Sequence, residues 1–275
     1  MALMDAFGYA GKRVAVVGGA TGMGAAAAEL VKEAGAEVVV LDRAPVTQEG
    51  VTSITLDLSD KNSIETAAAA LGGRIDALFS CAGVAEGTPG IEKINWVGHR
   101  YFIELLLERD AFNKGSAIGF ISSAAGLGWE PNLPLLKEWL AITDFDAAAQ
   151  WAIDNEKATY QWTKRAICTF VATEAYNFLK KGIRVNAILP GPTDTPLAQA
   201  NAQTWLGFGK DYRDDAGITA ATPLEQAYPL VFLCSQAASA ISGITLITDD
   251  GYMSSGLTES YPAAAPIVKY FYSGA

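Results

Sequence analysis

The chain has 275 residues, half of them hydrophobic, which is enough to bury the core of one large domain or two small ones. Its formal net charge of −10 argues against nucleic acid or an anionic membrane as a partner. The only histidine is His99, which leaves histidine-based zinc sites almost excluded, so we expect no metal.

The cysteines and the first residues bear on the compartment. Cys81, Cys168 and Cys234 lie far apart in apolar runs, which predicts free thiols in a reducing compartment rather than a disulfide framework. Residues 1–11 show no basic region followed by an apolar core, and no apolar run reaches the ~18 residues of a membrane span. We therefore expect a cytoplasmic protein.

The pattern along the chain alternates short apolar runs with longer helical stretches. Strands are predicted at 13–18, 37–41, 51–58, 77–80, 117–121, 184–189 and 244–248. Helices are predicted at about 25–34, 60–71, 92–113, 135–142, 145–153, 157–181 and 223–235. This alternation predicts one α/β domain over residues 1–275, a doubly wound, Rossmann-like parallel sheet of seven strands with helices on both faces.

A glycine-rich turn, GGATGMG, joins the first strand to the first helix. In this context glycines allow a tight turn, a close backbone approach to a pyrophosphate and close packing of the helix on the strand, while the helix N-terminus favours phosphate. The turn therefore predicts a dinucleotide site. Its candidate contacts are Gly18, Thr21, Gly22, Met23 and Gly24.

Asp42 closes the second strand, 18 residues after Gly24. A carboxylate there can accept hydrogen bonds from a ribose and would repel a 2′-phosphate, which favours NAD over NADP. The neighbouring Arg43 points the other way, because arginine suits a 2′-phosphate.

Later strands also end in candidate ligand contacts, at the edge of the sheet where such folds bind ligands. Asp57 and Leu58 follow the third strand, where an adenine could rest, and the small residues Cys81, Ala82 and Gly83 follow the fourth. The sixth strand runs into a rigid loop at 190–196, whose threonines could bond a carboxamide. Its candidates are Pro190, Gly191, Thr193 and Thr195. The polar and aromatic segment 201–217 is typical of a mobile lid.

Tyr160 and Lys164 lie four residues apart on the long predicted helix and so share one face. A fixed ammonium beside the phenol is expected to lower its pKa, which would let the pair exchange a proton with an alcohol or ketone near neutral pH. Alone, this pattern is common by chance. Serines at 122 and 123 follow the fifth strand, and strand alternation sends them to opposite faces.

Taken together, these residues resemble the short-chain dehydrogenase/reductase family over nearly the whole chain. Gly18, Gly22 and Gly24 match its glycine pattern, and Ser80-Cys81-Ala82-Gly83 resembles its Asn-Asn-Ala-Gly segment with both asparagines lost. The family's tetrad corresponds in order to Asn95, Ser123, Tyr160 and Lys164. Pro190-Gly191 and the threonines after it resemble the segment that holds the nicotinamide.

The resemblance implies a role for each member of the tetrad. Tyr160 would give or take the proton, Ser123 would stabilise the developing oxyanion, and Ser122 is the weaker candidate. Lys164 would bond the nicotinamide ribose, and Asn95 would hold a water in a proton relay. His99, one turn after Asn95, is interpreted as structural, with a part in the relay as the alternative.

Two segments depart from most members of the family. An insertion at 129–156 resembles that of the bacterial 3α-hydroxysteroid dehydrogenase/carbonyl reductase branch, which lies beside the substrate cleft and alters subunit packing. Trp129, Trp139 and Trp151 would suit a bulky apolar substrate, a subunit interface or simple packing. The aromatic tail 257–275 is expected to pack on a neighbouring subunit or to border the site.

The implied function is an NAD-dependent dehydrogenase that transfers a hydride between nicotinamide and a hydrophobic secondary alcohol or ketone, with a hydroxysteroid as the leading substrate. An aryl or terpene alcohol is the alternative, and a cofactor-binding regulator without catalysis is a remote one. An epimerase is disfavoured because nothing suggests a sugar-nucleotide domain. A homo-oligomer, tetramer or dimer, is expected.

Overall fold

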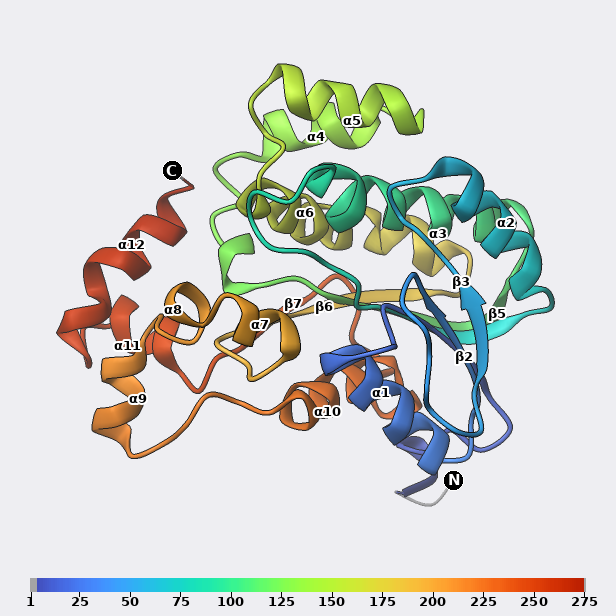
Figure 1. Cartoon of the computed structure of the whole chain (residues 1–275), viewed down its shortest axis with the longest axis horizontal. Helices are drawn as coiled ribbons and strands as arrows, with labels where there is room; N and C mark the ends of the chain where they lie inside the picture. The colour runs from blue at the N-terminus through green and yellow to red at the C-terminus, as the bar shows by residue number, and fades with distance from the viewer. Residues whose placement is uncertain (1–3, 275) are drawn as a thin grey trace.

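Seven parallel strands form one sheet in the order β3-β2-β1-β4-β5-β6-β7. The computed structural model describes residues 4–274, and the sheet runs through its centre (Figure 1). The strands are β1 (Arg13–Val17), β2 (Glu37–Asp42), β3 (Thr52–Thr55), β4 (Ile75–Ser80), β5 (Phe112–Ile121), β6 (Arg184–Pro190) and β7 (Thr245–Thr248). The expected doubly wound parallel sheet is confirmed.

Two apolar cores lie on the two faces of the sheet, because successive strand side chains point to opposite faces. In β1, Val14 and Val16 belong to one core, whereas Ala15 and Val17 belong to the other. Helices α1 (Gly22–Glu33) and α10 (Pro223–Cys234) cover the first face. Helices α2 (Lys61–Leu71), α3 (Gly98–Glu108) and α6 (Tyr160–Lys180) cover the second (Figure 1).

The strand order reverses between β1 and β4. From β1 the chain builds β2 and β3 on one side and then returns to add β4 on the other. The segments that follow β1 and β4 therefore leave the sheet in opposite directions. This opens a crevice beyond the carboxyl ends of the two strands, which is where doubly wound sheets bind ligands.

Three predicted elements, the helix at 92–113 and the strands at 51–58 and 117–121, have wrong bounds. The helix expected at 92–113 is a π-helical turn, Lys93–Val97, followed by α3, which ends at Glu108. Asp110 then takes a left-handed conformation with φ 54°, and Phe112 pairs with Ile75 as the start of β5. The strand expected at 51–58 covers only Thr52–Thr55, because the residues beyond it turn away around the Asp57 carboxylate, which accepts the Ser59 N–H and O–H.

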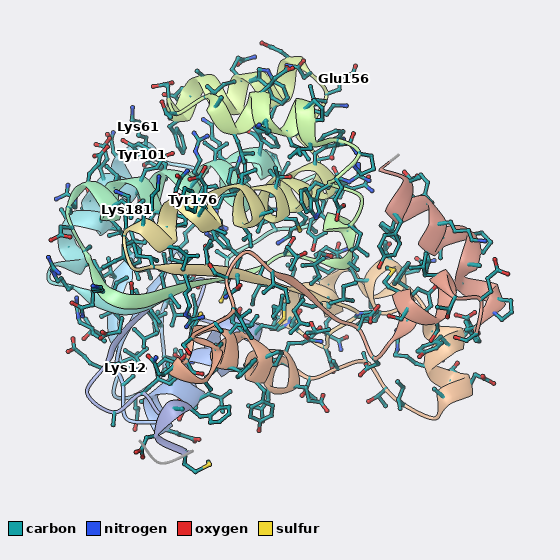
Figure 2. All side chains as sticks on the ribbon, turned by 180° about the vertical axis from the view of Figure 1, so that it is seen from behind. Lys12, Lys61, Tyr101, Glu156, Tyr176 and Lys181 are labelled. Carbon is teal, nitrogen blue, oxygen red and sulfur yellow. The ribbon has the colours of Figure 1, made fainter. Side chains whose placement is uncertain are left out.

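The insertion forms α4 (Leu133–Ala141) and α5 (Phe145–Asp154), a further layer over α6 (Figure 1). Figure 2 shows this layer from behind, with Glu156 at its end and Tyr176 on the exposed part of α6. Trp139 is fully buried, and its ring contacts those of Trp96 and Trp151 at centroid distances of 6.5 and 5.7 Å. Of the three readings of these tryptophans, the structure supports packing for Trp139 and Trp151.

The remaining helices gather beyond the carboxyl ends of β6 and β7 (Figure 1). They are α7 (Pro196–Ala200), α8 (Ala202–Trp205), α9 (Lys210–Ala216), α11 (Tyr252–Leu257) and α12 (Ala265–Ser273). Short 3-10 turns complete the chain at Met4–Ala6, Ala124–Gly126, Gln236–Ala238 and Pro262–Ala264. Across residues 4–274, no helix combines the length and apolar character needed to cross a bilayer.

Candidate active site

Two adjoining pockets open at the carboxyl edge of the sheet and share Met23 and Thr195 in their walls. We call the one beside β1 and β2 the cleft and the one beside α6 the apolar pocket. The cleft, about 230 Å³, is lined by Val17, Gly18, Thr21, Gly22, Met23, Gly24, Leu41, Asp42, Arg43, Leu56, Asp57, Leu58, Cys81, Ala82, Gly83, Val84, Ile94, Thr195, Pro196 and Leu197. The apolar pocket, about 310 Å³, is lined by Met23, Ser122, Ser123, Ala124, Ala125, Tyr160, Pro190, Gly191, Pro192, Thr193, Thr195, Ala198, Thr204, Trp205, Phe208 and Phe271.

The glycine turn has no space for side chains at two of its positions. A Cβ on Gly18, where φ is +80°, would lie 2.4 Å from the Ala82 nitrogen, and one on Gly24 would lie 2.1 Å from the Gly18 oxygen. Thr21 precedes α1 without a side-chain capping bond. The first N–H groups of a helix have no partners within it, so this end of α1 offers donors and a positive dipole to an anionic group in the cleft.

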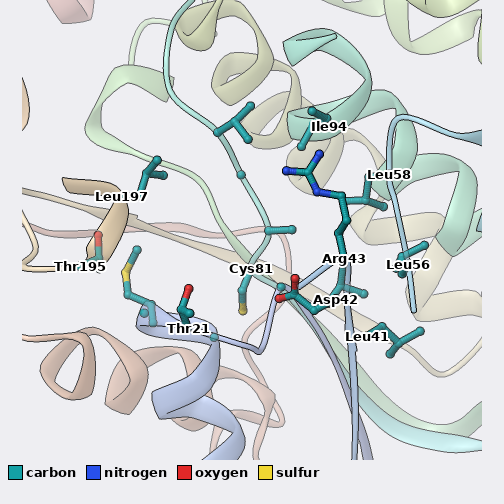
Figure 3. A pocket seen from close by; sticks show the side chains of 18 of the residues that line it. Thr21, Leu41, Asp42, Arg43, Leu56, Leu58, Cys81, Ile94, Thr195 and Leu197 are labelled. Carbon is teal, nitrogen blue, oxygen red and sulfur yellow. The ribbon is translucent and has the colours of Figure 1, made fainter. Parts of the chain in front are cut away.

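The Asp42 carboxylate is fixed at the end of β2. One oxygen accepts the Ala20 N–H and the other the Ala44 N–H, each at 2.9 Å. Figure 3 shows this carboxylate at the middle of the cleft, on the side of Cys81. Asp42 is thus held against the glycine turn, where an acceptor for sugar hydroxyls would be placed.

Arg43 turns away from Asp42, in the direction of Ile94 (Figure 3). Its side chain is 71% exposed, and its guanidinium lies 3.9 Å from the Asp57 carboxylate. Burial raises the pKa of Asp57, but the hydrogen bonds from Ser59 and the charge of Arg43 outweigh it, so the net shift is downward. The positive charge of Arg43 is therefore already partly balanced.

Gly83 separates the cleft from two buried polar side chains. A Cβ at Gly83 would lie 3.5 Å from Asn95 Oδ1 and 3.6 Å from Lys164 Nζ. Asn95 is fully buried and pairs with Val84, accepting its N–H at 2.7 Å and donating to its carbonyl at 3.0 Å. The Asn95 amide is thus engaged with the loop backbone, and its relay role stays a prediction.

Ser80 and His99 form a buried couple beneath the same loop. His99 Nε2 donates to the Ala82 carbonyl at 3.0 Å, because that oxygen can only accept, and Nδ1 therefore accepts the Ser80 hydroxyl. Burial lowers the pKa of His99 to about 4, so the ring is neutral at pH 7. The structure thus gives His99 a structural role, in which Ser80 and His99 brace the cleft in a segment where the family pattern has an asparagine.

Tyr160 is the first residue of α6 and lines the apolar pocket together with Ser123. Thr159 caps the helix, and Glu86 accepts the Tyr160 N–H at 2.7 Å. The ring lies 5.3 Å from that of Trp205. Burial raises the Tyr160 pKa, and a hydrogen bond with Ser123 opposes that rise.

Lys164 lies one turn further along α6 and is buried, with 4% of its surface exposed. Its Nζ donates to the Ile121 carbonyl at 3.1 Å and lies 5.4 Å from the centre of the Tyr160 ring. Burial lowers the Lys164 pKa to about 8. The Tyr160 pKa is raised and not lowered as expected, because burial outweighs the hydrogen bond with Ser123.

The two serines after β5 serve different partners, in line with strand alternation. Ser122 is buried and donates to the Lys164 carbonyl at 3.0 Å. Ser123 accepts the Ala125 N–H at 3.2 Å and hydrogen-bonds with Tyr160. Only Ser123 is thus directed to the phenol.

The loop after β6 presents two threonines of different capacity. The Thr193 hydroxyl donates to the Gly191 carbonyl at 3.0 Å, whereas the Thr195 hydroxyl accepts the Ala198 N–H at 3.1 Å. Thr195 therefore keeps its proton for another acceptor, such as a carboxamide oxygen.

Every predicted site residue except Asn95 and Lys164 lines one of the two pockets, and those two lie directly behind Gly83. Most of the apolar lining was not predicted from the sequence. In the cleft these residues include Leu41, Leu56, Val84, Ile94 and Leu197, and in the apolar pocket Ala124, Ala125, Ala198, Trp205 and Phe208. The aromatic tail was expected to pack on a neighbouring subunit or to border the site, and its Phe271 lines the apolar pocket.

The insertion contributes no residue to either wall, among the residues that line them. Its expected place beside the substrate cleft is therefore wrong for these pockets. Its two helices dock on α6 and the π-helical turn instead.

Several known proteins are similar to this chain in sequence and in fold. The chain is 30% identical over 251 residues to a coniferyl-alcohol dehydrogenase from Pseudomonas sp. strain HR199, covering 88% of this chain and 97% of the relative. It is 29% identical over 253 residues to the 3α-hydroxysteroid dehydrogenase/carbonyl reductase of Comamonas testosteroni, covering 86% and 95%. The crystal structure of a 3α-hydroxysteroid dehydrogenase from Pseudomonas sp. B-0831, complexed with NADH, matches with a TM-score of 0.72 at 29% identity, covering 88% of this chain and 98% of that one.

A family model described as enoyl-(acyl carrier protein) reductase matches residues 18–253, from the glycine turn to the start of α11. That span holds every predicted catalytic residue. Fold, sequence relatives and family model agree, and the chain belongs to the short-chain dehydrogenase/reductase family.

Proposed function

We propose that this protein is an NAD-dependent oxidoreductase that interconverts a hydrophobic secondary alcohol and its ketone. The observation that carries the proposal is the grouping of Ser123, Tyr160 and Lys164. The first two line a pocket with mostly apolar walls that adjoins a cleft suited to a dinucleotide, and Lys164 lies one turn further along α6. A relative that carries NADH and has a similar fold supports a nicotinamide cofactor.

The cleft fits such a cofactor by its own geometry. A Cβ at Gly24 would fill the turn, and the first N–H groups of α1 face the space that a pyrophosphate would take. Asp42 would accept the ribose hydroxyls and repel a 2′-phosphate, which supports NAD. Arg43 is directed to Asp57 and so weakens the case for NADP.

In the proposed reaction, the protein handles the proton and the substrate oxygen. Tyr160 exchanges its hydroxyl proton with that oxygen, and Ser123 donates a hydrogen bond to the charge that develops there. Lys164 holds a positive charge behind Gly83 and would bond the ribose of a bound cofactor. The nicotinamide supplies the hydride chemistry when bound.

Two substrate classes suit a pocket whose walls are mostly apolar and whose polar groups include Ser123 and Tyr160. A hydroxysteroid, the substrate expected from the sequence, is supported by two relatives that carry that name. An aryl alcohol is the second, supported by the coniferyl-alcohol dehydrogenase relative. Assembly as a homo-oligomer stays a prediction.

The test compares Tyr160→Phe with Tyr176→Phe, a change at an exposed tyrosine of the same helix. With a panel of steroidal, aromatic and terpenoid alcohols, NADH formation should fall about a hundredfold or more in the first variant and stay unchanged in the second. NADH binding, followed by fluorescence, should survive in both. Full turnover by Tyr160→Phe would refute the tyrosine assignment, and NADH binding without any turnover by the wild type would favour a non-catalytic regulator.

Cofactor choice is tested separately with Asp42→Ala, using Asp154→Ala as a control at an exposed carboxylate on α5. The ratio of NAD to NADP efficiency should fall in the first variant only. An unchanged ratio would remove the claim that Asp42 selects NAD.

A further inference from the structure

The last described helix, α12, reaches the substrate side of the site. Phe271, near its end, lines the apolar pocket, as Tyr160 and Ser123 do. Its ring meets Phe208 edge to face at 6.0 Å, and Phe208 meets Tyr252 of α11 at 5.1 Å. The lid and the tail therefore join through aromatic contacts.

The end of this helix is held by the catalytic helix itself. Arg165, the residue after Lys164, is fully buried, and its Nη1 donates to the Gly274 carbonyl at 3.0 Å while its Nε donates to the Leu127 carbonyl at 3.1 Å. Asn132 adds a second donor to the Gly274 carbonyl at 2.7 Å. Charge-assisted bonds from a buried guanidinium are strong and directional, so this grip fixes the tail against α6.

Gly128 allows the tail to come this close. Its φ is +72°, and a Cβ there would lie 2.2 Å from the Phe271 oxygen and 2.8 Å from the Gly274 nitrogen. No side chain fits at this position without moving the backbone that carries Phe271.

The wall formed by α12 bounds a small space. The apolar pocket measures about 310 Å³, near the lower limit for sites that hold small molecules. Part of that space adjoins Pro190, Gly191 and Thr193, the predicted nicotinamide contacts, and so is not open to the substrate.

We infer that α12, clamped by Arg165 and Asn132, is a fixed wall that restricts the substrate to compact alcohols of one or two rings, and that Phe271 is the residue that excludes larger ones. This inference rests on the proposed function and chooses, within its hydrophobic alcohols, the aryl class over the four-ring steroid. Phe271 acts by shape, whereas Arg165, Asn132 and Gly128 are positioning residues.

The experiment compares two wall variants with two controls. Phe271→Ala removes the obstructing ring, and Gly128→Ala displaces the backbone behind it. Gly11→Ala is matched to the second change, because Gly11 has φ +71° and open space around its missing Cβ. Ile267→Ala alters an exposed residue of α12 outside the pocket.

The substrates are methyl phenyl carbinol, methyl naphthyl carbinol and androsterone, each with NAD. The wild type should use androsterone roughly tenfold less efficiently than the carbinols, and both wall variants should raise the ratio of androsterone to methyl phenyl carbinol by a similar factor, while the controls leave it unchanged. Hydrogen exchange of the α12 amides, measured without cofactor, should quicken in Gly128→Ala and in Asn132→Ala but not in Gly11→Ala.

Efficient use of androsterone by the wild type would overturn the inference, and so would a ratio that the wall variants do not move. A parallel loss for all three substrates would also overturn it, since a size filter must discriminate. Absence of turnover of every alcohol by the wild type would instead contradict the proposed function. Even in that case, unchanged hydrogen exchange of the α12 amides in both Gly128→Ala and Asn132→Ala would refute the inference that these residues fix α12.

Discussion

Lys164→Met should make the cofactor-free protein more stable while it abolishes turnover. The Lys164 ammonium is buried, and burial lowers its pKa from 10.5 to about 8. A shift of this size means that keeping the charge in the folded state costs about 3 kcal/mol. Methionine fills a similar volume without charge. It loses the hydrogen bond to the Ile121 carbonyl and the ammonium's contact with the Tyr160 ring, at about 1 kcal/mol each. We therefore expect a net gain of roughly 1 kcal/mol in the free energy of unfolding near pH 7.

The pH dependence of the stability difference tests separately whether Lys164→Met is more stable than the wild type. Between about pH 8 and 10.5 the unfolded chain keeps the Lys164 proton while the folded chain has lost it. The free energy of unfolding rises with pH wherever the unfolded state binds more protons. The wild type should therefore become more stable relative to Lys164→Met across this pH window. The advantage of Lys164→Met is full below pH 8 and should disappear as pH approaches 10.5.

The assay is urea unfolding of both proteins, without cofactor and at one protein concentration, at several pH values from neutral to alkaline. Other titrating groups are common to both chains, so the difference isolates Lys164. A variant that is less stable at neutral pH, with a difference that does not change up to pH 10, would refute the buried-charge reasoning. Activity of the same variant then tests the catalytic role independently.

Three further predictions concern the supports of the site. Ser80→Ala should lower the free energy of unfolding by about 1–3 kcal/mol, because it leaves His99 Nδ1 buried without a donor; unchanged stability in urea would contradict the assigned tautomer. Trp139→Ala should cost about 3–5 kcal/mol of stability yet leave the NADH Kd unchanged, since the insertion lines neither pocket. Gly24→Ala should weaken NADH binding about tenfold or more in a fluorescence titration, because its Cβ would meet the Gly18 oxygen at 2.1 Å, whereas Gly87→Ala, with open space, should not.

The sequence alone predicted the sheet, the place of the ligand site and the family. Strand and helix periods are local properties, and the carboxyl ends of parallel strands must share one edge, so Gly18, Asp42, Gly83 and Ser123 could be assigned to one region before any contact was known. The two covered faces followed from the same alternation, whereas the order of the strands is known only from the structure.

Tertiary structure decided what depends on contacts between distant segments. The direction of the Tyr160 pKa shift follows from burial, which no spacing of residues reveals. The insertion, expected beside the substrate, packs Trp139 into the core, whereas the tail supplies Phe271 to the apolar pocket. Arg165 and Gly274 are 109 residues apart, and only the fold shows that the helix carrying Tyr160 and Lys164 also holds the segment whose Phe271 lines the apolar pocket.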